Sequence, residues 1–168
     1  AKDFVYSWRR TADPKTKAGY SYIYDGIKNF DAIQKGTMKP DKLGVSAPND
    51  STLVVKLSKP VPYFKLLLAF PTFFPEQQST VEKYGSKYGT SSKTSAYNGP
   101  FKSVGWNGTN NTWKLVKNPN YWDKKHVHLS TINFQVVKSP ETGLNLYEQK
   151  KLDVTPLSGT QVANYQNK

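Results

Sequence analysis

Two histidines, His126 and His128, have a spacing that could hold a metal ion. Side chains two positions apart on a strand share one face, so both imidazoles could bind the same ion. Asp123 is the only acidic residue close to them in sequence, and there is no cysteine. Two exposed polar residues near a turn explain the pair more simply, so we predict no metal site. The lack of cysteine also excludes disulfides and a cysteine nucleophile.

The 12 carboxylates form no pattern typical of catalysis. Residues such as Asp3, Asp13 and Asp50 lie near predicted helix starts, turns or loops, where capping explains them. The chain also lacks Gly-x-Ser-x-Gly, His-Glu-x-x-His and a glycine-rich loop that could bind phosphate. We therefore predict that the protein is not an enzyme and needs no cofactor.

Aromatic residues are the candidates for ligand contact, and Tyr20, Tyr22 and Tyr24 are the densest group. One interpretation is packing of a helix face, with the hydroxyls reaching water at its edge. The other is the wall of a ligand cleft, because tyrosine offers apolar area together with a hydroxyl for a peptide backbone. Packing is the favoured interpretation from the residues alone. Three tryptophans are predicted to lie in the core: Trp106, Trp113 and Trp122.

The chain carries a formal net charge of +12, which is typical of proteins that bind nucleic acids or anionic surfaces. Only Arg9 and Arg10 among its 24 basic residues are arginines, the type that binds phosphates and base edges bidentately. The lysines are scattered along the chain, which favours a solvated surface. We predict no nucleic-acid partner, with a basic surface adhesin or nucleic-acid-binding module as the alternative class.

Hydrophobic periodicity predicts helices and one hairpin in the first half of the chain. Apolar residues recur every three or four positions over 18–34, which predicts one long helix there. Pro48-Asn49-Asp50-Ser51 is a typical turn sequence, so the strands that flank it are predicted to pair as a hairpin. The predicted helices are 2–11, 18–34, 62–70 and 76–84, and the predicted strands are 43–47 and 52–57.

The second half contains mainly strands after a polar segment, 86–97, that is rich in serine, threonine and lysine and predicts a linker. Ser139-Pro140 predicts a helix start, with serine at the cap and proline in the first turn. The mixture of helices and strands predicts the α+β class in two lobes. The predicted elements are strands 101–106, 112–117, 132–137 and 152–155 and a helix over 140–150.

Six phrases of the sequence occur in the order found in OppA-like oligopeptide-binding proteins, the family 5 solute-binding proteins of ABC importers. Each phrase is short, but together they span almost the whole chain, which therefore resembles this family. The phrases are Asp-Phe-Val-Tyr-Ser-Trp (3–8), Leu-Gly-Val-Ser-Ala (43–47), Lys-Pro-Val-Pro-Tyr-Phe (59–64), Val-Glu-Lys-Tyr-Gly (81–85), Asn-Gly-Pro-Phe (98–101) and Asn-Pro-Asn-Tyr-Trp-Asp (118–123).

The resemblance implies part of a periplasmic-binding-protein type II-like fold. Members of the family are much longer, so the chain is expected to be an internal fragment. Residues 1–95 would form the accessory second lobe and residues 96–168 part of the first main lobe. A cleft tyrosine of the family matches Tyr20, although Gly19 replaces the usual preceding proline. Tyr22 or Tyr24 could take this role instead.

The implied function is the binding of an oligopeptide outside the cytoplasm, with hinged closure around it and delivery to a membrane ABC permease. The protein would be a cell-surface lipoprotein of a Gram-positive bacterium or a periplasmic protein. It would meet the membrane only through a lipid anchor that is absent from this chain. Nickel, a sugar or a pheromone peptide is the alternative ligand. Cut out of its parent, the chain is predicted to form edge-paired or domain-swapped oligomers.

Overall fold

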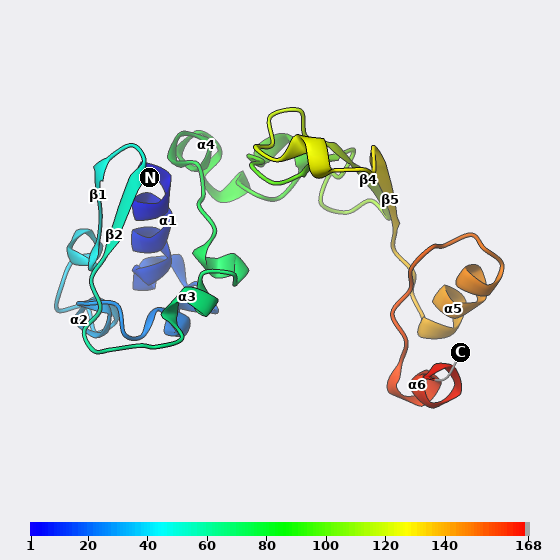
Figure 1. The fold of residues 1–168 in the computed structure, drawn as a ribbon, viewed down its shortest axis with the longest axis horizontal. Coiled ribbons are helices and arrows are strands. Elements are labelled where there is room, and N and C mark those ends of the chain that lie inside the picture. Colours follow the sequence, from blue (N-terminus) through cyan, green and yellow to red (C-terminus); the bar gives the residue numbers. More distant parts are fainter. Residues whose placement is uncertain (167–168) are drawn as a thin grey trace. The chain divides into compact units, whose positions relative to one another are not determined.

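The computed structural model describes residues 1–166, in which the chain divides into two units (Figure 1). Unit 1 contains Ala1–Gly89 and Thr94–Ala96, whereas unit 2 contains Thr90–Lys93 and the chain from Tyr97 onward. The boundary between them therefore falls within the polar segment between Gly89 and Tyr97. Both units combine helices with a small antiparallel sheet, which confirms the predicted α+β class.

Helix α1, Lys2–Ala12, opens unit 1 and agrees with the predicted helix to within one residue. Its acidic residue Asp3 is in the first turn and Arg9 and Arg10 are in the last turn, where each charge complements the helix dipole. The helix ends at Asp13, whose carboxylate accepts a hydrogen bond from the Lys15 backbone N–H at 2.9 Å. Trp8 and Ala12 lie on the buried side of α1.

The predicted helix over 18–34 is wrong, because only two short helical segments form there: the 3-10 helix Ser21–Tyr24 and helix α2, Phe30–Gln34. The backbone between them is held by a distant segment. Ile27 forms an antiparallel bridge with Leu57, and the Lys28 N–H donates to the Lys56 carbonyl at 2.9 Å. Pairing with the hairpin therefore replaces the helical hydrogen bonds that local periodicity predicted.

The hairpin pairs strand β1, Val45–Asn49, with strand β2, Thr52–Val55. Its register places Val45 opposite Val55 and Asn49 opposite Thr52 around the predicted turn. Two short helices follow. Helix α3, Phe64–Leu67, is shorter than the predicted 62–70 and is followed by a separate 3-10 turn, Pro71–Phe73, whereas helix α4, Gln78–Tyr84, is close to the prediction.

The core of unit 1 lies between α1, α2 and the hairpin (Figure 1). Its residues come from four separate stretches of sequence, 8–12, 24–33, 43–45 and 73, so burial depends on tertiary contacts as well as on local pattern. Partly buried residues such as Phe4, Leu53 and Phe64 surround it. The buried members of this core are Trp8, Ala12, Tyr24, Ile27, Phe30, Ile33, Leu43, Val45 and Phe73.

Unit 2 contains a three-stranded antiparallel sheet in the order β3-β4-β5. Its strands are β3, Phe101–Val104, β4, Thr112–Lys117, and β5, Thr131–Gln135. Trp113 and Phe134 are cross-strand partners in this sheet, and their rings stack with centroids 5.3 Å apart. Such a pair stabilises one face of the sheet beyond its apolar area alone.

Two helices follow the sheet: α5, Pro140–Glu148, and α6, Gly159–Tyr165. The Ser139 hydroxyl caps α5 as predicted, accepting from the Thr142 N–H. The predicted strand over 152–155 does not form, and α6 was not predicted. Trp122 is 86% exposed, so its predicted core position is wrong for this chain. Within residues 1–166, no helix has the length and apolar character needed to span a membrane.

Candidate ligand-contacting site

Two buried side chains of unit 1 fix the segment that carries the candidate site. The Trp8 indole N–H donates to the Phe73 carbonyl at 2.9 Å, and the Tyr24 hydroxyl donates to the Thr72 carbonyl at 2.8 Å. The Tyr24 and Phe73 rings stack with centroids 4.5 Å apart, and Trp8 meets both rings edge-on. Because both hydrogen bonds end on backbone carbonyls, the core sets the position of the chain at 72–73.

A pocket of about 250 Å³ opens beside this segment and is lined by α1, by residues 16–20 and by residues 71–76. We call it the tyrosine pocket. Its aromatic lining residues are Tyr20, which is 54% exposed, and Phe74, which is 53% exposed. Two further exposed aromatics adjoin Tyr20: the Tyr22 ring centroid is 6.0 Å away and the Phe70 centroid is 5.5 Å away. The result is an aromatic surface open to a ligand.

Arg10 and Glu76 are the two charged side chains that line the tyrosine pocket. The Arg10 guanidinium donates to both carboxylate oxygens, with Nη1–Oε distances of 2.9 and 3.2 Å. This ion pair, made through one guanidinium nitrogen, neutralises both charges and joins α1 to the chain that follows Phe74. The pocket therefore offers aromatic faces, the Tyr20 hydroxyl and a paired charge. These groups can bind a mixed polar and apolar molecule, but they do not form a nucleophile–base arrangement.

The structure separates the three predicted site tyrosines. Tyr20 and Tyr22 are exposed and adjacent, whereas Tyr24 is fully buried and belongs to the core. The burial of Tyr24 favours the packing interpretation for that residue. Sequence reasoning missed Phe70 and Phe74, although the density of aromatic residues around Pro71 was a visible signal.

The two histidines do not take part in this site. Asp123 contacts the His126 Nδ1 within the same turn of unit 2. Over residues 1–166, no three histidine, cysteine or acidic side chains come together in a way that could hold a metal ion.

Tyr24 gives unit 1 a pH dependence that can be measured. Burial raises the pKa of its hydroxyl well above the usual value, and the nearby Glu76 raises it further, although Thr11 opposes this. Above pH ~10 the unfolded chain loses this proton while the folded chain keeps it, so the free energy of unfolding falls by up to ~1.4 kcal/mol per pH unit. We expect Tyr24→Phe to remove this contribution to the slope and to cost about 1 kcal/mol at pH 7.

Urea unfolding at a series of pH values between about 9 and 11, followed by circular dichroism, would measure this effect. Tyr63→Phe is the matched control, because it removes the same hydroxyl at a position that is 58% exposed. Equal slopes in the wild-type chain and Tyr24→Phe would contradict the assignment.

All of residues 1–168 match the family model described as "Bacterial extracellular solute-binding proteins, family 5 Middle". The "Dipeptide-binding protein" of Lactococcus lactis is 45% identical over 171 residues, covering 100% of this chain and 31% of the relative. The "Periplasmic oligopeptide-binding protein OppA" of Salmonella typhimurium is 40% identical over 157 residues, covering 92% of this chain and 28% of the relative. The chain thus spans about a third of the length of these curated relatives.

Among solved structures, the chain is similar to that titled "Listeria monocytogenes OppA bound to peptide". The match has a TM-score of 0.91 and 50% sequence identity, and it covers 99% of this chain and 33% of the solved one. At this level of identity, the two folds correspond over nearly the whole of this chain.

Proposed function

Because the chain belongs to the bacterial extracellular solute-binding proteins of family 5, we propose that it forms part of a receptor that binds oligopeptides and delivers them to an ABC importer. The observation that carries this proposal is the match over nearly the full chain to a solved OppA that is bound to peptide. The tyrosine pocket supports it, because exposed aromatic faces accept varied side chains and a tyrosine hydroxyl can pair with a peptide backbone group.

We propose that residues 1–95 form the accessory lobe of this receptor and residues 96–168 part of its first main lobe. The peptide would be enclosed by hinged closure of the complete protein, which would then present it to the permease. The receptor would act outside the cytoplasm, as a surface lipoprotein or in the periplasm, and would bind its ligand without chemical change. The division of the chain near residues 89–97 is compatible with this assignment.

Native mass spectrometry of the full-length protein that carries this chain, purified without denaturation, tests the proposal. We expect a ladder of bound masses that match short peptides. A single mass that is not a peptide would keep the family and change the ligand. A protein that is empty and also ignores an added pool of peptides would contradict peptide binding altogether.

Tyr20 is the residue of the tyrosine pocket whose loss should weaken binding most. Its ring is half exposed and contacts both Tyr22 and Phe70, so it can act as an aromatic anchor for a ligand. We expect Tyr20→Ala in the full-length protein to weaken the binding of a co-purified peptide about tenfold, which corresponds to ~1.4 kcal/mol. Isothermal titration calorimetry would measure the change in dissociation constant.

Tyr63→Ala is the matched control for this variant. Tyr63 has a similar exposed fraction, 58%, but does not line the tyrosine pocket. Its substitution should change affinity less than about twofold. If the two variants weakened binding equally, Tyr20 would have no specific role in ligand contact.

A further inference from the structure

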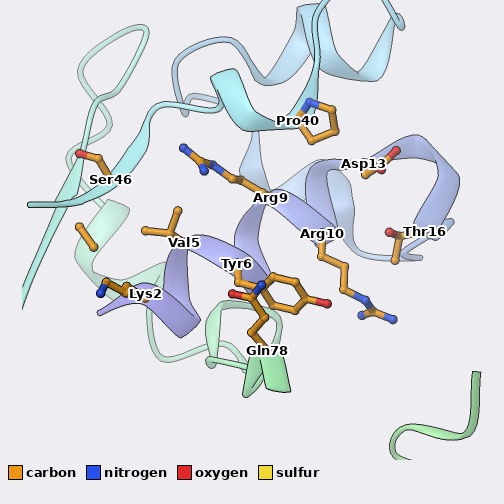
Figure 2. A pocket seen from close by; sticks show the side chains of 11 residues that line it. Lys2, Val5, Tyr6, Arg9, Arg10, Asp13, Thr16, Pro40, Ser46 and Gln78 are labelled. Atoms are coloured by element: carbon orange, nitrogen blue, oxygen red, sulfur yellow. The ribbon is translucent and has the colours of Figure 1, made fainter. Parts of the chain in front are cut away.

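A second depression, of about 700 Å³, lies along α1 and is bordered by β1, by Pro40 and by the start of α4 (Figure 2). We call it the α1 groove. It shares Arg10 and Thr16 with the tyrosine pocket but otherwise has its own lining. Figure 2 shows that the Arg9 and Arg10 side chains leave α1 in different directions, with Arg9 toward the side of Ser46.

Four charged side chains line the α1 groove, and three of them already have partners. Arg10 is paired with Glu76, and the Asp13 carboxylate accepts from the Lys15 backbone. The Lys2 ammonium lies 3.4 Å from the Asp50 carboxylate. The fourth, Arg9, has no carboxylate partner among residues 1–166. Among the residues that the structure describes, the groove therefore holds one guanidinium, Arg9, and one carboxylate, Asp13, that have no ion-pair partner.

The hydrogen bonding of Arg9 is also incomplete. Its Nε is buried without a hydrogen-bond partner in the described chain. Its Nη2 reaches the Val45 carbonyl at 3.5 Å, which is long for a hydrogen bond. A guanidinium has five N–H donors, and buried donors are nearly always paired in native proteins. The Nε itself has almost no accessible surface, so the donors that Arg9 can offer to the groove are those of its terminal nitrogens.

The rest of the lining indicates what kind of molecule would supply the acceptor. Val5, Pro40 and Ala47 are apolar, whereas Ser46 and Gln78 offer polar groups. Ser46 and Ala47 also belong to β1, which pairs only with β2 within the described sheets. An extended peptide has the matching combination of backbone groups and apolar side chains. A polyphosphate surface such as nucleic acid would instead call for several uncompensated cations.

We propose that the α1 groove binds an extended protein segment that carries an acidic side chain, with the carboxylate paired to Arg9. Arginine forms its strongest hydrogen bonds with carboxylates, because its planar guanidinium matches their two oxygens. The segment's backbone would lie near β1 and its apolar side chains near Val5 and Pro40. This proposal does not depend on peptide transport, because it concerns a different surface from the tyrosine pocket.

Nuclear magnetic resonance of the ¹⁵N-labelled full-length protein that carries this chain tests the proposal with two synthetic peptides. The probe is N-acetyl-Ala-Leu-Glu-Leu-Ala-amide, and its control has glutamine in place of glutamate. We expect saturable shifts of the Arg9 Nε–H signal and of the Ser46 amide, with about tenfold tighter binding of the glutamate peptide, the preference expected for one charge-assisted hydrogen bond. This preference should shrink as salt is added.

Arg9→Gln should abolish the preference for glutamate, whereas Lys35→Gln should keep it. The control removes the same charge from an exposed position outside the groove. Equal affinity for the two peptides in the wild-type chain would overturn the proposal even if Arg9→Gln failed to fold. Shifts confined to Tyr20 and Tyr22 would also overturn it. So would binding of phosphatidylglycerol vesicles at Arg9 without binding of either peptide.

Discussion

Trp8→Ala is expected to lower the free energy of unfolding of unit 1 by about 3–5 kcal/mol, the range for deleting a buried tryptophan. The Trp8 side chain is 1% exposed and packs edge-on against Phe4, Tyr24 and Phe73. Its removal would leave a cavity at the centre of the aromatic core. It would also leave the Phe73 carbonyl without its indole donor.

This loss should extend to the candidate site, because Trp8 and Tyr24 hold the backbone on which Phe74 and the pocket wall depend. Trp8→Phe separates the effect of the cavity from the effect of the lost hydrogen bond, since it keeps most of the ring and loses the N–H donor. We expect Trp8→Phe to cost less than the alanine variant, with at least ~1 kcal/mol arising from the unpaired Phe73 carbonyl.

Native-state amide hydrogen exchange, resolved by residue, is the suitable measurement, because two units need not unfold as one. Trp122→Ala is the matched control, since it deletes the same side chain at a position that is 86% exposed. It should change the stability of either unit by less than ~0.5 kcal/mol. A Trp8→Ala variant as stable as Trp122→Ala would mean that the aromatic core does not hold unit 1 together.

Sequence reasoning succeeded where the deciding interactions are local. Helix α1 follows from apolar spacing, a first-turn acid and a terminating Asp-Pro, all within 14 residues. The start of α5 likewise follows from Ser139 and Pro140. The predicted helix over 18–34 failed because Ile27 and Lys28 form their backbone bonds with Leu57 and Lys56, a choice that local periodicity cannot reveal.

The candidate site shows the same division. Residue type and density predict Tyr20 and Tyr22 as candidates, and the structure leaves both exposed, whereas the burial of Tyr24 depends on its contacts with Trp8 and Phe73. The Arg10–Glu76 pair joins residues 66 positions apart, so no local pattern indicates it. The proposed ligand class comes from the family resemblance, because the groups of the pocket alone would suit many mixed polar and apolar molecules.

Asn118 has in unit 2 the role that Trp8 has in unit 1, that of a buried side chain that joins distant segments. We expect Asn118→Ala to lower the free energy of unfolding of unit 2 by about 2–3 kcal/mol. This side chain is 1% exposed. Its amide donates to the Gly99 carbonyl at 2.9 Å, and its carbonyl oxygen accepts from the Asn120 N–H at 3.1 Å. Alanine would leave both partners unpaired in a part-buried setting, which costs about 1–3 kcal/mol for each fully buried group.

The position of these bonds explains why a polar residue should matter so much. Asn118 ties the turn after β4 to the chain that enters β3, and its backbone N–H donates to the Pro100 carbonyl at 2.8 Å. Asn118→Asp at neutral pH should be at least as damaging as alanine, because a carboxylate cannot donate to the Gly99 carbonyl and its charge would be buried. Loss of exchange protection in β3 and β4 is the expected readout.

Asn120→Ala is the control, because the exposed Asn120 contributes its backbone N–H to this turn and alanine keeps that group. It should cost less than ~0.5 kcal/mol. If the two alanine variants lost equal protection, the Asn118 side chain would not be what joins the turn to β3. The asparagine of the Asn-Pro-Asn-Tyr-Trp-Asp phrase would then need an explanation outside this chain's own fold, whereas a selective loss at Asn118 would make it a structural clamp.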